Sequence, residues 1–179
     1  MNTWLISDTH FFQESILTFT DYKTGKLLRP DFDNIQQHDE YIIEQWNSTV
    51  KPEDTVYHLG DVCDIDQQHR YPEIHDLLNG TKHLIVGNHD DIRFQSKVEW
   101  ASVVFWKDFY EHNLLLTHTP QDDFVLLRGK PGKSFGEWAP GYRTNVHGHI
   151  HQNSPPTRRH VCVCVEHTEY KPVNLDKYI

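Results

Sequence analysis

The 179-residue sequence predicts an α/β protein in which helices flank mixed sheets. In the first half of the chain, short apolar segments alternate with segments of helical periodicity. The second half changes to short strand-like segments that are joined by turns. A β-α-β-α-β opening followed by further strands is typical of mixed sheets with helices outside. Because no internal repeat, low-complexity tract or linker divides the chain, we expect a single domain over residues 1–179.

The first half contains the expected helices and the first three expected strands. Apolar residues recur at helical spacing after the alternative N-caps Asp33 and Asn34, which predicts a helix to about Thr49. A second helix is expected over residues 67–78, before the stop signal Asn79-Gly80. The expected strands cover residues 2–7, 55–59 and 83–86.

Four more strands are expected in the second half, at residues 103–106, 114–117, 145–147 and 161–165. Two long connections, residues 11–34 and 121–144, are candidates for substrate selection, because long loops in compact proteins are often functional. A solvated rim is an equally good interpretation of each. The first connection has side chains suited to stacking a base or clamping a phosphate, namely Phe11, Phe12, Tyr22, Arg29 and Phe32. The second is locally basic, with Arg128, Lys130, Lys133, Trp138 and Arg143.

The composition restricts the class of function. A net charge of −9 argues against a surface that grips long duplex nucleic acid. No apolar segment is long enough to span a bilayer, and the first residues lack the pattern of a signal peptide, so we expect a cytoplasmic protein without a membrane partner. Three cysteines, an odd number, argue against a disulfide framework. The 14 histidines are unusual, and histidine is the commonest metal ligand.

Polar clusters follow five of the expected strands. Ligands bind beyond the carboxyl ends of strands in open α/β sheets, so these clusters are expected to meet. Carboxylate, imidazole and amide oxygen suit Mn, Fe(II), Zn, Co or Ni. Asp8 and His10 are two residues apart, so an extended segment would turn both towards one cation. Neighbouring glycines would let the backbone turn tightly. The clusters are Asp8-x-His10, Gly60-Asp61, Gly87-Asn88-His89-Asp90, Thr117-His118 and Gly148-His149-Ile150-His151.

Together these clusters resemble the motifs of the calcineurin-like metallophosphoesterase superfamily, which are D-x-H, G-D, G-N-H-[DE], a lone His and G-H-x-H. The resemblance covers residues 4 to about 175 and is closest to small single-domain members from bacteria and phages. It implies a four-layer α-β-β-α sandwich of two mixed sheets flanked by helices. It also implies two divalent cations, with Mn expected and Fe, Zn, Ni or Co as alternatives. The first would be held by Asp8, His10 and His151, and the second by Asn88, His118 and His149, with Asp61 bridging both.

The resemblance also implies the chemistry. A hydroxide between the cations would attack phosphorus, with Asp61 as the bridging ligand and His89 as general acid. Asp90 would orient His89 or its loop rather than bind a cation. The expected substrate is a phosphodiester in a small nucleotide-like molecule. Phosphomonoester hydrolysis and cleavage of short single strands are alternatives for the same site, and a non-catalytic metal-binding scaffold is a third. The sequence leaves the oligomeric state open.

The other histidines and cysteines are expected to be structural. His58 and His147 are expected to be packed or hydrogen-bonded in strands. Cys162 and Cys164 share one face of a strand and are expected to be small buried residues, with a soft-metal or redox pair as the alternative. Gln13 departs from the family, since similar sequences tend to carry histidine there. The histidines expected at the surface are His38, His69, His75, His83, His112, His160 and His167.

Overall fold

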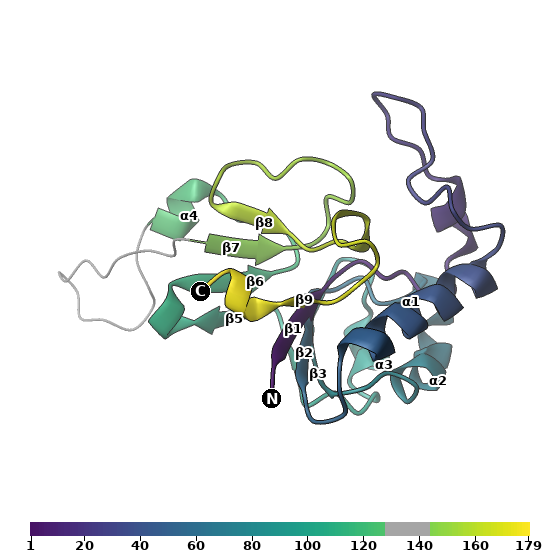
Figure 1. The fold of residues 1–179 in the computed structure, drawn as a ribbon, viewed down its shortest axis with the longest axis horizontal. Helices are drawn as coiled ribbons and strands as arrows, with labels where there is room; N and C mark the ends of the chain where they lie inside the picture. Colours follow the sequence, from purple (N-terminus) through teal and green to yellow (C-terminus); the bar gives the residue numbers. More distant parts are fainter. Residues whose placement is uncertain (128–143) are drawn as a thin grey trace.

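The computed structural model describes residues 1–127 and 144–179, which form two sheets with helices on their outer faces (Figure 1). The first sheet has, in spatial order, β4 (Ser102–Val104), β3 (Thr81–Ile85), β2 (Thr55–His58), β1 (Thr3–Ile6) and β9 (Val173–Asn174). The second has β5 (Trp106–Phe109), β6 (Leu114–Thr117), β7 (Thr144–His147) and β8 (His160–Cys162). β9 is antiparallel to β1 and β5 is antiparallel to β6, whereas the other pairs are parallel. Both sheets are therefore mixed, as predicted.

Alternation along the strands creates the layers. Leu5 and Ile85 point into a cluster shared by the two sheets, while their neighbours Ile6 and Leu84 point into a cluster beneath the helices. The helices of that outer layer are α1 (Ile35–Thr49), α2 (Tyr71–His75) and α3 (Ile92–Gln95). On the far side, α4 (Asp123–Leu127) packs Leu126 against Leu115 of β6. The result is the predicted order of helix, sheet, sheet and helix.

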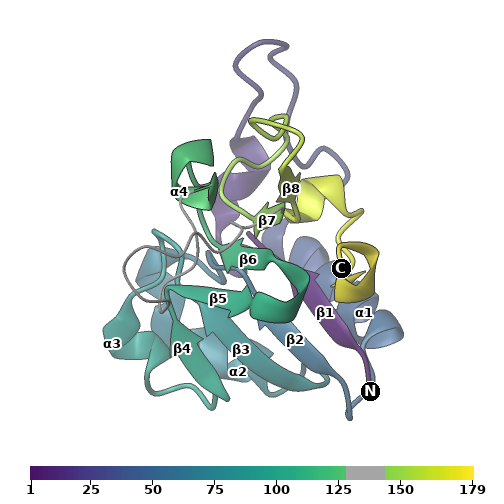
Figure 2. The same cartoon turned by 90° about the vertical axis from the view of Figure 1, so that its left-hand side faces the viewer.

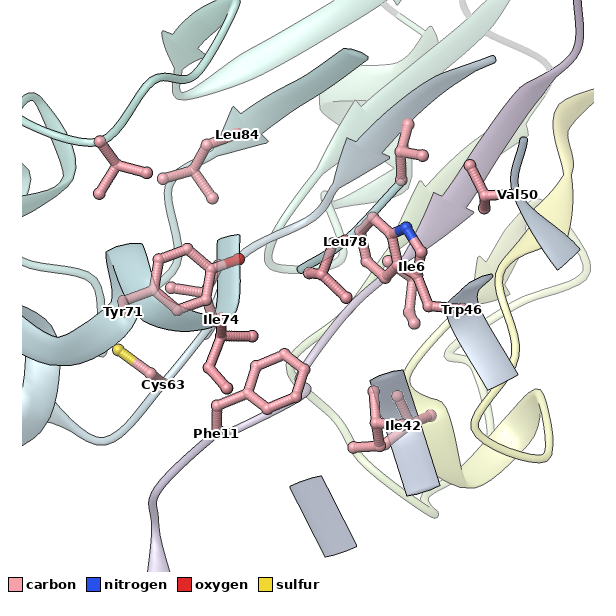
Figure 3. Packing of buried hydrophobic residues seen from close by; sticks show 14 residues of the cluster. Ile6, Phe11, Ile42, Trp46, Val50, Cys63, Tyr71, Ile74, Leu78 and Leu84 are labelled. Atoms are coloured by element: carbon pink, nitrogen blue, oxygen red, sulfur yellow. The ribbon is translucent and has the colours of Figure 1, made fainter. Parts of the chain in front are cut away.

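Helix α1 matches its prediction closely. The Asn34 side chain accepts a hydrogen bond from the backbone amide of Gln37, which identifies Asn34 as the N-cap. The helix buries its apolar face, and Trp46 and Ile42 lie in the same cluster as Ile6 (Figure 3). The cluster of 14 buried residues between α1, α2 and the first sheet is the larger of the two main cores.

The second predicted helix, residues 67–78, is wrong in type over its first four residues and ends at His75, three residues early. Residues 67–70 belong to a 3-10 helix, η2 (Ile65–Arg70), and the α-helix begins only at Tyr71. Pro72 is the physical reason, because proline lacks an amide hydrogen and is tolerated only in the first turn of an α-helix. The two-residue strand β9 was not predicted, and the predicted strand 161–165 ends as β8 at Cys162.

The expected strand 103–106 is divided between the two sheets. β4 ends at Val104 in the first sheet, and β5 begins at Trp106 in the second, so the chain crosses at Phe105 (Figure 2). None of the helices in the described ranges 1–127 and 144–179 is both long and apolar enough to cross a membrane.

Candidate dinuclear metal centre

The polar clusters lie at the carboxyl ends of the parallel strands, and backbone hydrogen bonds join one cluster to the next. The amide of Asp8 donates to the Gly60 carbonyl at 3.0 Å, and the amide of Gly148 donates to the His118 carbonyl at 2.8 Å. Because β1, β2 and β3 are parallel neighbours, as are β6 and β7, their ends meet at one edge of the sandwich. The structure thus brings together the residues that the sequence proposed as ligands.

Several of these residues have a left-handed backbone, which corrects one sequence argument. Residues 8 and 10 are not extended, since both have positive φ angles, and their side chains converge through these turns instead. Non-glycine residues in this region are uncommon and cost of order 1 kcal/mol each. Such outliers concentrate at functional sites. The five affected candidates are Asp8 (φ 59°), His10 (φ 51°), Asp61 (φ 57°), His149 (φ 71°) and His151 (φ 48°).

The glycines of the clusters serve two different purposes. Gly60 has a positive φ of 95°, which L side chains rarely adopt. Gly87 and Gly148 have ordinary φ angles, but a Cβ atom at either position would collide with the Asp61 or the Asp8 carboxylate, respectively. These two glycines therefore permit close approach of a loop to a candidate ligand rather than an unusual turn.

Asp8, His10 and His151 form the first ligand group. Their ligand atoms all lie within 4.8 Å of one another. The Nε2 atoms of His10 and His151 lie 3.8 and 3.9 Å from Asp8 Oδ1. Asp8 Oδ1 and His10 Nε2 are buried and have no hydrogen-bond partner among the described residues. Buried polar atoms without partners are costly, so the donor set fits a divalent cation bound between them.

Asp61, His118 and His149 form the second ligand group, again with ligand atoms within 4.8 Å of one another. The Asn88 side chain joins this group, because its Oδ1 lies 2.9 Å from His118 Nε2. The His118 and His149 rings are 5.1 Å apart between centroids. His149 is exposed, whereas the carboxylate and His118 are buried.

Asp61 connects the two groups. Its Oδ2 atom lies 3.9 Å from His10 Nε2 in the first group and 3.4 Å from His118 Nε2 in the second. The other carboxylate oxygen, Oδ1, accepts a hydrogen bond from the His89 amide at 2.9 Å. One oxygen is thus occupied, and the other faces both groups. A shared carboxylate is what two adjacent cations need to offset their repulsion.

Hydrogen bonds made by the Nδ1 atoms orient three of the histidines. His118 Nδ1 donates to the Leu59 carbonyl at 2.7 Å, and His151 Nδ1 donates to Glu166 Oε1 at 2.9 Å. His10 Nδ1 pairs with Gln13 Oε1 at 2.7 Å. Because these partner oxygens accept the Nδ1 proton, each ring presents Nε2 to its group, which is the usual outer-shell arrangement of metal-binding histidines. Gln13, the departure from the family, therefore positions a candidate ligand.

Arg29 corrects an expectation. It was a candidate to clamp a substrate phosphate, but its side chain is 0% exposed. Its guanidinium donates to the backbone carbonyls of Asp8 and Thr9 at 2.6 and 3.0 Å and to Glu166 Oε1 at 2.9 Å. Arg29 therefore holds the strained Asp8 segment from behind and pairs with the carboxylate that orients His151. The role of Glu166 was missed, because this residue belongs to no motif and lies in a 3-10 helix (Val165–His167).

Other predicted contacts of residues 11–34 are also revised. Phe11 is fully buried in the core beneath the helices (Figure 3). Phe32 packs against Tyr41 and Tyr170. Phe12 is half-buried under the guanidinium of Arg70, at 4.1 Å from the ring centroid. Of the five side chains proposed to contact substrate, Tyr22 is the one that stays highly exposed, at 78%. The candidates of the second connection, Arg128, Lys130, Lys133, Trp138 and Arg143, lie outside the described residues.

The carboxylates make the centre anionic. Burial raises the pKa of Asp8, but the neighbouring imidazoles of His10, His118 and His151 outweigh it and hold this pKa well below its usual value. Burial also opposes ionisation of Asp61, yet His118 lowers its pKa. Burial lowers the pKa of His118, whereas its hydrogen bond with Asp61 and the charges of Asp8 and Asp61 raise it to about 9. The centre therefore attracts positive charge, whether a proton or a cation.

His89 and Asp90 lie beside the ligands but serve differently. The His89 backbone is fixed at both ends, because its amide donates to Asp61 and its carbonyl accepts from Gln68 at 3.0 Å. Its half-buried ring lies edge-on to the His10 ring, with centroids 5.6 Å apart. Asp90 accepts backbone hydrogen bonds from Asp61, Val62 and Gly87. Asp90 thus orients the loops, as predicted.

For the remaining histidines, the structure confirms some of the expected placements and contradicts others. His58 and His147 are buried and hydrogen-bonded, as expected. His38, His75 and His160 are buried, so their placement at the surface was wrong. Each has partners in the structure, namely Arg29 and Asp39 for His38, Tyr71 and Trp100 for His75, and the Gln121 carbonyl for His160. His83 is half-buried, and His69, His112 and His167 are exposed.

The three cysteines are buried and free. Cys162 and Cys164 fill space behind the first ligand group, where Cys164 Sγ lies 3.2 Å from Asp8 Oδ2. Cys63 packs in the core against the helices, and burial raises the pKa of its thiol. Cys162 and Cys164 are therefore small buried residues, as predicted.

Two hollows border the centre. The first, of about 540 Å³, has Asn88 and His118 in its wall, and we call it the aromatic hollow because Phe105 and Trp106 form its outer side. The second, of about 740 Å³, has His149 and His151 in its wall, together with Tyr22. Each ligand group therefore opens on space outside the centre.

Comparisons with known proteins bear on the family of this chain. The family model of the calcineurin-like phosphoesterase superfamily domain matches residues 1–166. An uncharacterized protein of Methanocaldococcus jannaschii is 31% identical over 97% of this chain and 86% of its own length. The Gene 66 protein of Mycobacterium phage L5 is 34% identical over 50% of this chain and 40% of its own length. The crystal structure of a protein of unknown function, AQ665, from Aquifex aeolicus has a TM-score of 0.68 at 25% identity and 99% coverage of both chains. On the family match and the full-length relative, this chain belongs to the calcineurin-like phosphoesterase superfamily.

Proposed function

We propose that this protein is a phosphodiesterase that uses two divalent cations to hydrolyse a small nucleotide-like substrate. The position of Asp61 carries the proposal, because one of its oxygens faces both ligand groups while the other is held by the His89 amide. A scaffold that binds no metal has no need for a buried carboxylate in this position, where its charge is offset by imidazoles alone.

Seven residues would hold the cations. Nitrogen and oxygen donors without thiolate favour borderline ions, of which Mn is our proposal. When bound, the two cations would activate a water molecule as nucleophile and offset the charge of the phosphoryl oxygens. Asp61 would bridge them, the first would be held by Asp8, His10 and His151, and the second by Asn88, His118 and His149.

His89 would protonate the leaving oxygen. Its backbone is fixed between Asp61 and Gln68, so its ring is held at the rim of the first ligand group without belonging to it. A donor in that position acts on a substrate oxygen rather than on a cation. The two hollows support a diester in particular, because two separate spaces border the centre and each could take one organic substituent.

The test is cleavage of bis-p-nitrophenyl phosphate and p-nitrophenyl phosphate in the presence of Mn. We expect the diester to be the better substrate, and we expect Asp61→Asn to lower kcat by about a thousandfold or more, since the bridge is lost. Asp66→Asn is the matched control, because Asp66 is exposed and belongs to neither ligand group. Undiminished activity of the Asp61 variant would overturn the proposal, and faster monoester cleavage would assign the protein to phosphomonoesterases.

The acid role of His89 has a separate test. A p-nitrophenolate leaves without a proton, whereas an alkoxide needs one. His89→Ala should therefore slow a dinucleotide far more than bis-p-nitrophenyl phosphate, with a difference of about a hundredfold. Equal losses on both substrates would contradict the acid role.

A further inference from the structure

We propose that the aromatic hollow binds the base of a nucleotide substrate, which stacks on Trp106 and Phe105 while its phosphate lies at the second ligand group. This inference rests on the proposed function and names the class of substrate. It concerns a surface next to the centre, and none of the ligand positions depends on it.

Strand register places both aromatic residues beside the ligand loops. Trp106 pairs with Thr117, which directly precedes the candidate ligand His118. On the other side, the Val86 amide donates to the Val104 carbonyl at 2.8 Å, so Phe105 lies next to the segment that leads to Asn88. The strand position beside Trp106 is therefore one residue before His118, and the segment beside Phe105 leads within two residues to Asn88.

The crossing between sheets explains why these rings are not in a core. Because the chain leaves the first sheet at Val104 and enters the second at Trp106, neither core encloses this point. Phe105 is 59% exposed and Trp106 is 62% exposed. Large exposed aromatics beside a catalytic centre are suited to stacking on a base, which contributes about 1–3 kcal/mol per base.

The lining of the hollow favours a flat, uncharged group with a polar edge. None of the described residues that line it is Asp, Glu, Lys or Arg. Its apolar side includes Val86, Leu115 and Val125, and its polar side includes Thr119 and Gln121. Its volume of about 540 Å³ lies within the range of small-ligand pockets. Among the described residues that line the hollow, a second phosphate would meet no cationic side chain, whereas a nucleobase finds both stacking surfaces and amide partners.

The experiment compares two ligands that share a phosphate and differ by the base. Binding of adenosine 5′-monophosphate and of ribose 5-phosphate is measured by calorimetry on the Mn-loaded protein. We expect the nucleotide to bind about tenfold more tightly, and we expect Trp106→Ala to bring this ratio close to one. Trp106→Phe should retain most of the preference. Phe94→Ala is the control, because Phe94 is a partly exposed aromatic on α3 that lines neither hollow.

Several results would overturn the inference. Equal affinities in the wild type, or an unchanged ratio in folded Trp106→Ala and Phe105→Ala proteins, would exclude stacking in this hollow. A loss confined to Tyr22→Ala would place the base in the other hollow. A change of oligomeric state in Trp106→Ala with an unchanged ratio would identify the rings as a contact between copies of the chain. Because the ratio is a binding measurement, it stands or falls separately from hydrolysis by the Asp61 variant.

Discussion

The two ligand groups of this protein are built differently although they share Asp61. In the first group, Asp8 and His10 are fully enclosed and are braced by a buried ion pair between Arg29 and Glu166. In the second group, His149 is exposed, and Asn88 and His118 line an open hollow. We therefore propose that the first group holds its cation more tightly and that the second is the more open to substrate.

The physical origin of the difference lies in how many chain segments meet behind each group. Arg29 reaches the Asp8 carbonyl from the connection after β1, and Glu166 reaches His151 from near the C-terminus. A buried ion pair that also makes hydrogen bonds is costly to break, at about 3–5 kcal/mol. Behind the second group, His118 is oriented by one backbone carbonyl, that of Leu59. Two histidines of the first group, His10 and His151, are thus oriented by other side chains.

The largest expected effect separates the groups by their metal content. His10→Ala should weaken Mn binding at the first group by more than about a hundredfold, since even an outer-shell partner is worth 10–100-fold. His149→Ala should remove the second cation and leave the first in place. Elemental analysis after dialysis counts the cations per chain, with His112→Ala as the control because His112 is exposed. Loss of both cations in His149→Ala would contradict the conclusion that the two ligand groups differ in how they hold a cation.

The next effect concerns pH and the second group alone, which can be measured in His10→Ala. The pKa of His118 is raised to about 9, so below that pH a proton competes with the cation for the ring. Mn affinity of the second group should therefore rise about tenfold per pH unit from pH 7 to 9 and level off above. Titration calorimetry in two buffers also reports the released proton. A flat profile between pH 7 and 9 would show that His118 is not protonated before binding.

The smallest expected effect tests the bracing of the first group. Glu166→Gln keeps an acceptor for His151 but removes the charge that pairs with Arg29, so we expect Mn binding at the first group to weaken about tenfold. The second group should be unaffected. Glu169→Gln is the matched control, because Glu169 is exposed in the same segment. Equal weakening at both groups would mean that Glu166 acts on the fold rather than on His151.

Sequence patterns were sufficient where a residue's role depends on its neighbours in the chain. The ends of β6 and β7, the choice of Asp33 or Asn34 as N-cap and the apolar face of α1 follow from local periodicity and capping. Sequence patterns failed where a partner that is remote in the chain decides whether a side chain is buried. Arg29 was expected to clamp a substrate phosphate and His38 to lie at the surface, yet both are buried. The two side chains contact each other, and Glu166 pairs with Arg29 while Asp39 pairs with His38. The second helix failed because Pro72 stops an α-helix from forming before Tyr71.

The sequence by itself determined which residue types stand at the strand ends and therefore the family and the candidate ligands. Only the tertiary structure decided that Asp61 faces both groups, that Gln13 and Glu166 orient two of the histidines, and that Phe105 and Trp106 lie beside the second group. Motifs consist of residues that are close in the chain, so their spacing and their position after a strand can be predicted from the sequence. Bridging, bracing and the shape of a hollow depend on segments that are remote in the chain, in the case of Arg29 and Glu166 by 137 residues, and packing alone brings them together.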